Sequence, residues 1–160
     1  MGRTVSVLAA VLAATVVGAA QATTPVQAQG ITGPELAAIL QDAGYRAQLE
    51  ADGEGDPLVR TGMGGVNVAI LFYDCDPAHR CNSLQFSAGF DLPEGTTDAV
   101  INGFNRDYRY ARAFLDEERD PFLHFDFEVV HTAQADYVRS QIDSFEQLLP
   151  EFQRLIGFGG

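Results

Sequence analysis

The segment from Cys75 to Cys81 holds the residue types in this sequence that could do redox or metal chemistry. The two cysteines enclose five residues, His79 among them, and the chain has no other cysteine. If the protein is exported, an even number of cysteines favours an intrachain disulfide. The alternative is a soft-metal site made by both thiolates and His79 with Asp74 or Asp76. The spacing matches none of the common paired-cysteine zinc patterns and holds no C-x-x-C pair, so we predict a disulfide and no bound metal.

Acidic residues in segment 52–56 resemble the start of a calcium-binding loop. Asp52, Glu54 and Asp56 alternate as the first ligands of such a loop do. The sixth position is Pro57 instead of glycine and the twelfth is Met63 instead of glutamate. Because the match fails where the motif is most specific, we predict a solvated turn.

The remaining nucleophiles and bases form no recognisable catalytic pattern. Ser83 and Ser87 lack the G-x-S-x-G elbow, and His124 and His131 are read as packed or exposed residues. The chain has no lysine, which excludes Schiff-base chemistry and the phosphate-loop lysine. We therefore predict no enzyme activity and no cofactor. An enzyme of unrecognised type stays open as an alternative, because active sites also assemble from residues far apart in sequence.

The clearest candidate for a binding site is an arginine cluster in an acidic chain. Three of the nine arginines that follow residue 28 are Arg106, Arg109 and Arg112. Asn102 and Asn105, three residues apart, share one face of a predicted helix. We predict that Asn102, Asn105, Arg106 and Arg109 form a contact surface. The alternative is that Asn105 caps the helix, the arginines complement its negative end and the neighbouring tyrosines pack on strands.

The first 28 residues are typical of a secretory signal peptide. Arg3 is followed by an uncharged apolar run from Val5 to Ala20 and then by small residues. Cleavage fits after Ala22 or after Ala28, and we favour Ala28. The apolar run is shorter than the roughly 20 residues that span a bilayer. We therefore expect cleavage and a periplasmic or extracellular protein.

The expected mature protein, residues 29–160, is acidic and has the length of a single domain. Nine arginines face 22 carboxylates, which gives a net charge of about −13. Nucleic acid is then excluded as a partner, because phosphate binding needs the opposite sign. No later apolar run is long enough to span a membrane.

Hydrophobic periodicity predicts an α+β domain in which helices pack on an antiparallel sheet. The predicted elements, in order, are a helix (31–43), four strands (45–49, 58–61, 66–73 and 84–90), a helix from residue 97, two strands (108–115 and 122–130) and a helix (133–156). Thr32 is the expected cap of the first helix. Pro150 interrupts the apolar stripe of the last helix and is expected to kink or divide it.

Several of these segments together resemble a known family. They are Leu36 to Gly44, the run Gly65-Val66-Asn67, the two cysteines, the run Leu84-Gln85-Phe86, and the run from Asn102 through Asn105 to Arg109 and Tyr110. On them the chain resembles the YbjN-domain family of bacterial proteins, which is labelled a sensory transduction regulator, over nearly all of the expected mature domain. Phe104 stands where the family usually has tryptophan. The resemblance implies a fold similar to type III secretion chaperones, a role in regulation or protein binding, and no catalytic residue.

The residues and the resemblance together predict an exported, non-enzymatic module that binds a protein or peptide. Chaperone-like folds pair through helices and sheet edges, so the resemblance also implies a homodimer. The alternatives are a protein that binds a small molecule or an envelope polymer, and an enzyme of unrecognised type. A deep pocket with converging polar groups would favour these alternatives, and a broad apolar patch would favour protein binding.

Overall fold

The computed structural model describes residues 30–129 and 135–159 and confirms the predicted α+β class. The elements are β1 (Ile31–Thr32), α1 (Gly33–Asp42), β2 (Gln48–Ala51), β3 (Pro57–Met63), β4 (Val66–Cys75), β5 (Arg80–Gly89), α2 (Asp98–Asp107), β6 (Ala111–Leu115), β7 (Pro121–Glu128) and α3 (Ala135–Ile156). The predicted order lacks only the two-residue strand β1. The proposed leader and both cleavage points lie outside the described residues. Within the described part of the chain, no helix combines the length and apolar character needed to cross a membrane.

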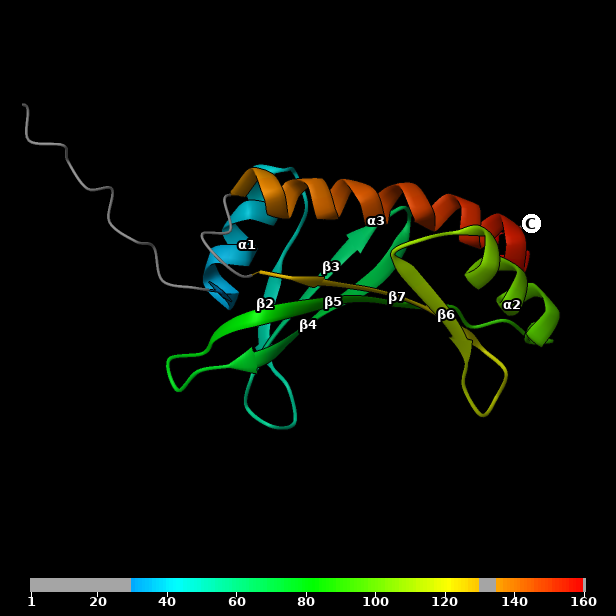
Figure 1. Ribbon diagram of the computed structural model, residues 1–160, viewed down its shortest axis with the longest axis horizontal. Coiled ribbons are helices and arrows are strands. Elements are labelled where there is room, and N and C mark those ends of the chain that lie inside the picture. Colours follow the sequence, from blue (N-terminus) through cyan, green and yellow to red (C-terminus); the bar gives the residue numbers. More distant parts are fainter. Residues whose placement is uncertain (1–29, 130–134, 160) are drawn as a thin grey trace, which may run out of the picture.

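All seven strands form one antiparallel sheet, and the three helices lie on one side of it. The strand order is β2-β3-β4-β5-β7-β6, with β1 paired to the start of β5. Figure 1 shows α3 running along the sheet, with α1 near one of its ends and α2 near the other. The sheet therefore has one face that helices cover and one face that they leave open. The strands at its two edges are β2 and β6.

The core lies between α3 and the covered face of the sheet. Every third or fourth residue of α3 is buried, as the period of an amphipathic helix requires: Val138, Ile142, Phe145, Leu149, Phe152 and Ile156. The Phe145 ring lies 5.3 Å from that of Phe86 and 6.0 Å from that of Phe125. These rings join the helix to two central strands.

The helix boundaries differ from the predicted ones in ways that packing explains. Thr32 caps α1 and forms a reciprocal capping box with Glu35, as the cap prediction requires. Pro150 does not divide α3, which continues on both sides of it. Pro150 is exposed, whereas Leu149 and Phe152 are buried and hold both halves of the helix on the sheet.

Two strands also begin later than the pattern predicts. The strand predicted over 108–115 starts at Ala111, because α2 runs to Asp107 and Tyr108 then stacks on Phe104 at 4.7 Å. The strand predicted over 45–49 corresponds to β2, which begins three residues later in the chain, at Gln48. The predicted ends at residues 130 and 133 lie outside the described residues.

One polar group interrupts the covered face and leads to a stability prediction. Thr61 alternates with buried Val59 and Met63 on β3, and its hydroxyl has no hydrogen-bond partner among the described residues. A buried polar group without a partner destabilises a fold by about 1–3 kcal/mol. We expect Thr61→Val to raise the free energy of unfolding by about 1 kcal/mol in urea denaturation.

The reverse substitution on the same strand is the control. Val59→Thr introduces a hydroxyl at a fully buried position and should lower the free energy of unfolding. A Thr61→Val protein that is less stable than the native one would show that the hydroxyl has a partner.

Candidate functional site

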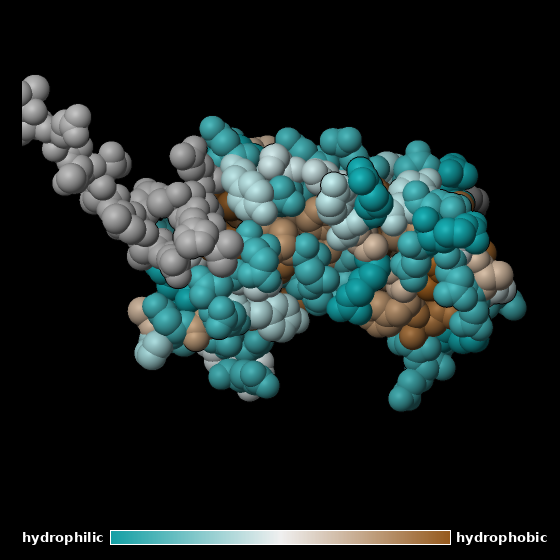
Figure 2. All heavy atoms as spheres, in the orientation of Figure 1, coloured by the Kyte–Doolittle hydropathy of each residue, from teal (hydrophilic) through white to brown (hydrophobic). Residues whose placement is uncertain are grey.

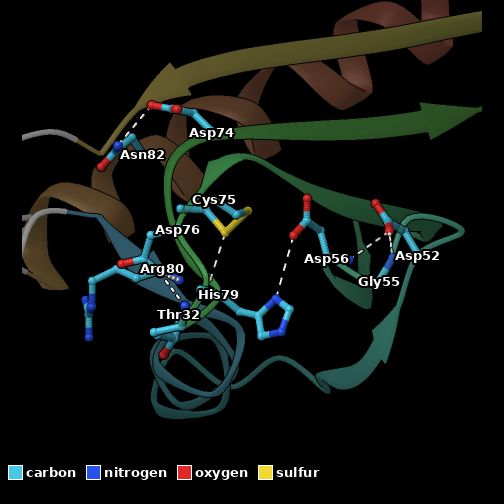
Figure 3. The surroundings of a disulfide bond; sticks show 12 residues. Thr32, Asp52, Gly55, Asp56, Asp74, Cys75, Asp76, His79, Arg80 and Asn82 are labelled. Carbon is cyan, nitrogen blue, oxygen red and sulfur yellow. Dashed lines mark hydrogen bonds and ion pairs between the residues drawn. A yellow bond between two sulfur atoms is a disulfide. The ribbon is translucent and has the colours of Figure 1, made fainter.

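Cys75 and Cys81 are joined by a disulfide that closes the hairpin between β4 and β5 (Figure 3), as predicted. They are direct partners in the strand register. Between them, the Asp76 carboxylate accepts hydrogen bonds from the backbone N–H groups of Ala78 and Arg80 at 2.8 and 3.0 Å. Both sulfurs are bonded to each other, so the thiolates that a metal site would use here are not free. The described residues hold no group of three or more His, Cys, Asp or Glu side chains placed to bind a metal.

The disulfide loop connects parts of the chain that lie far apart in sequence. His79 points toward Asp56 in the turn between β2 and β3, with 3.7 Å between its Nδ1 and the carboxylate (Figure 3). Arg80 donates to the Gly30 carbonyl at 2.9 Å and to the Glu35 carboxylate at 2.7 Å. Partial burial would raise the pKa of Glu35, but the contacts with Arg80 and Thr32 together outweigh it and lower the pKa. The loop thus holds the start of α1 beside the β2–β3 turn.

The acidic turn that resembles a calcium loop is organised by its own backbone. One oxygen of Asp52 accepts hydrogen bonds, each 2.9 Å long, from the N–H groups of Glu54, Gly55 and Asp56. This is the side-chain-to-backbone pattern of an Asx turn. The carboxylate serves the turn, in agreement with the predicted solvated turn.

The predicted contact residues all lie on the surface, but one of them also supports the fold. Asn105 donates to the Ala113 carbonyl at 3.0 Å and accepts from the Ala113 N–H at 2.7 Å. Asn102, Arg106 and Arg109 are exposed. Arg106 pairs with its neighbour Asp107 at 2.9 Å. Asn105 does not cap α2 as the alternative reading has it, because its amide bridges the helix to β6.

The Asn105 amide lies where a further strand would pair with β6. Ala113 is in the edge strand β6, and β7 occupies the other side of that strand. Since Asn105 binds both backbone groups of Ala113, these groups face away from β7. The side chain therefore occupies the centre of this sheet edge, which is one way proteins prevent strands from adding.

An exposed tyrosine, which is not among the predicted contact residues, completes this surface. Tyr110 is 74% exposed, and the Arg109 guanidinium lies 5.2 Å from its ring centre. Tyr108, two residues earlier, stacks on buried Phe104 and donates to Glu151 of α3 at 3.3 Å. We name Asn102, Arg106, Arg109 and Tyr110 the α2–β6 surface. In the sequence, neighbouring arginine and aromatic residues indicate this surface. Only the structure shows that Tyr108 packs on Phe104 whereas Tyr110 is exposed.

The open face of the sheet carries a chain of polar contacts across four strands. Tyr73 donates to Gln85 at 3.4 Å, Gln85 donates to Asp126 at 2.6 Å, and Asp126 lies 3.6 Å from Arg112. Arg112 is also 3.1 Å from Nδ1 of His124. Partial burial and the Arg112 charge lower the pKa of His124, which favours the neutral ring. Strand alternation places these residues on one face, but the register that brings them together is not visible in the sequence.

Beside this network the open face has a broad hollow of about 760 Å³. The residues that line it are Arg46, Ala47, Gln48, Arg60, Thr61, Gly62, Asn67, Val68, Ala69, Ser87, Gly89 and Phe122. The two charged residues among them are Arg46 and Arg60, so we name it the basic hollow. Arg60 pairs with Glu50 at 2.9 Å, whereas Arg46 makes no ion pair with any described residue.

A comparison with protein families shows the family of this chain. The family model for YbjN, described as "Putative bacterial sensory transduction regulator", matches residues 34–158. The chain belongs to the YbjN family. The YbjN match runs from α1 through α3 and so includes the disulfide hairpin, the α2–β6 surface and both sheet edges. No curated protein matches the chain.

The contacts of Asn105 generate a prediction that separates the two asparagines of the α2 segment. Asn105→Ala removes both partners of the Ala113 backbone, and we expect it to lower the free energy of unfolding by about 1–2 kcal/mol. Asn102→Ala is the matched control, since the exposed Asn102 side chain forms no hydrogen bond with the described residues, and should change it by less than about 0.5 kcal/mol. Urea denaturation measures both. Equal effects in the two variants would contradict a structural role for Asn105.

The disulfide generates a second prediction. Replacing both Cys75 and Cys81 with serine should lower the free energy of unfolding by about 2 kcal/mol, because the closed loop restricts the unfolded chain. Chemical denaturation without reductant measures the loss. Adding reductant to the native protein should give a similar loss and leave the double variant unchanged. A reductant effect on the variant would show that the loss has another origin.

Proposed function

We propose that this YbjN domain is an exported, non-enzymatic regulatory module that binds a protein partner through the α2–β6 surface. The observation that carries the proposal is the exposed Arg109–Tyr110 pair at the end of a rigidly supported helix. Arginine and tyrosine are enriched at the energetic centres of protein interfaces. The description of the family as a regulator supports the same role.

The contacts that hold the backbone of the α2–β6 surface in place favour a binding surface that is already formed before a partner binds. Asn105 fixes the end of α2 to β6, and Tyr108 joins the same turn to Phe104 and Glu151. Side chains on a fixed backbone lose less entropy on binding than those on a loose loop. Figure 2 shows a hydrophobic area over β6, which adds apolar surface at this end of the sheet.

The charge of the α2–β6 surface indicates which charge a partner should carry. The chain carries a formal net charge of −12, so this surface is a local exception: Arg106 is paired with Asp107, but Arg109 makes no ion pair with any described residue. Such a surface attracts carboxylates on a partner and disfavours basic proteins that the rest of the surface would attract. We therefore expect the partner to present an acidic patch.

Two features support export. The disulfide is compatible with an oxidising compartment outside the cytoplasm, and the apolar leader supports export.

A second candidate function is binding of a small molecule or an envelope polymer. The basic hollow favours it, because its volume falls within the range of about 300–1,000 Å³ that is usual for ligand pockets. The hollow is broad and its floor is largely backbone and small side chains. These features suit an extended ligand better than a compact one.

Crosslinking of the protein in its native cell envelope tests the proposed function. We expect a specific protein to be captured, and Arg106→Ala with Arg109→Ala should reduce its capture at least about tenfold. The double variant should keep its melting temperature, because both side chains are exposed.

Arg139→Ala is the control, as this arginine lies near the start of α3 and pairs with Asp42 of α1, away from the α2–β6 surface. It should leave capture unchanged. An early melting transition or undiminished capture in the Arg106 and Arg109 variant would reject the α2–β6 surface as the contact.

A further inference from the structure

The two edges of the sheet differ in how their outer backbone groups are satisfied. The Asn105 amide occupies the centre of the β6 edge. Strand β2, at the other edge, is paired only with β3 among the described residues. In that part of the chain no side chain donates to or accepts from the backbone of Gln48–Ala51. Unpaired edge groups of this kind can bind an added strand.

The register shows which groups of β2 point outward. The Asp52 N–H donates to the Asp56 carbonyl at 2.8 Å, so it points toward β3. N–H directions alternate along a strand, which directs the N–H and C=O groups of Leu49 and Ala51 away from β3. Pro57, the partner of Ala51, has no N–H to donate, in agreement with this assignment.

Two hollows of different character border β2 at successive positions. The basic hollow is lined by Arg46, Ala47 and Gln48 at the beginning of the strand. A second hollow of about 370 Å³ is lined by Leu49, Glu50 and Ala51. Its remaining walls are the start of α1, the β2–β3 turn and the disulfide loop: Thr32, Gly33, Pro34, Gly55, Pro57, Ala78 and His79. Most of these residues are apolar, so we name it the apolar hollow.

We propose that the free edge of β2 binds an extended segment of a partner protein, with a carboxylate beside the basic hollow and an apolar side chain beside the apolar hollow. The proposal rests on the proposed protein-binding function and adds a second surface to it. Strand addition gains affinity from main-chain hydrogen bonds and specificity from pockets for individual side chains. The two hollows border the consecutive segments 46–48 and 49–51. Since an added strand advances by the same rise of about 3.3 Å per residue, its acidic and apolar residues should lie about two to four positions apart.

Charge selects an acidic segment. Arg46 has no carboxylate partner among the described residues, and the basic hollow holds no acidic lining residue. Leu49 is 45% exposed and offers apolar contact at the second hollow. Arg60 is already paired with Glu50, so a basic segment would meet the unpaired Arg46, whereas an acidic one supplies its missing partner.

A second copy of the chain fits this edge less well than a segment of another protein. Stable protein interfaces bury about 1,200–2,000 Å² in total, whereas β2 has four residues. An extended segment needs only the strand edge and the two hollows.

A displayed library of random peptides of about 12 residues, selected against the purified protein, tests this inference. We expect selected peptides to share an acidic residue and an apolar residue two to four positions apart. Hydrogen exchange of the Leu49 and Ala51 amides should slow at least about tenfold when a selected peptide binds. Absence of enrichment, protection elsewhere, or amides that are already protected in the free protein would overturn the proposal. The last outcome would mean that the chain itself or a second copy occupies the edge.

Two variants and one matched control locate the binding. Arg46→Glu should weaken the binding of a selected acidic peptide at least about tenfold. The same peptide with lysine in place of its acidic residue should bind the Arg46→Glu variant more tightly than it binds the native protein. Ala51→Pro removes an outward N–H at an exposed position and should also weaken binding. Arg109→Glu, on the α2–β6 surface, should leave peptide affinity unchanged. If Arg109→Glu alone weakens the peptide, the β2 proposal is wrong and the proposed function stands.

Discussion

The structure depends on the burial of one face of α3 against a single sheet. Phe145 packs on rings from β5 and β7, while Phe152 lies 5.4 Å from Phe90 and 4.9 Å from Phe104 of α2. The same helix receives the Tyr45 hydroxyl on Glu146 at 2.6 Å, a contact that, with partial burial, raises the pKa of Tyr45 to about 12. Because one helix contacts the elements at both ends of the sheet, its position sets the positions of α1 and α2.

A sheet covered on one side has two consequences for function. Its open face must be compatible with water, and the polar network from Tyr73 to His124 together with the basic hollow meets that requirement. The backbone groups at its two edges must either be satisfied by side chains or be available to pair with another strand. Asn105 closes the β6 edge with a side-chain amide, whereas the backbone of β2 stays available among the described residues. The contrast between the edges is the reason we place strand addition at β2.

The disulfide hairpin holds together elements that lie beside β2. Its loop contacts the β2–β3 turn through His79 and the start of α1 through Arg80. These elements form walls of the apolar hollow beside β2. Gly33 also belongs to this region, since a side chain there would lie 2.5 Å from Leu49. The hollow therefore depends on a covalent link and on a residue without a side chain.

Local patterns in the sequence determine the α+β class, the order of the longer elements, the Thr32 cap and the disulfide. These follow from periodicity, from short-range hydrogen bonding and from an even cysteine count. The tertiary structure decides that Asn105 serves β6, that Pro150 leaves α3 undivided and that the open-face residues meet across strands. Each of these outcomes depends on strand register or on burial by distant residues, which no local pattern encodes. A one-residue change in register would turn every side chain of a strand to the other face, so the site exists only once the sheet is assembled.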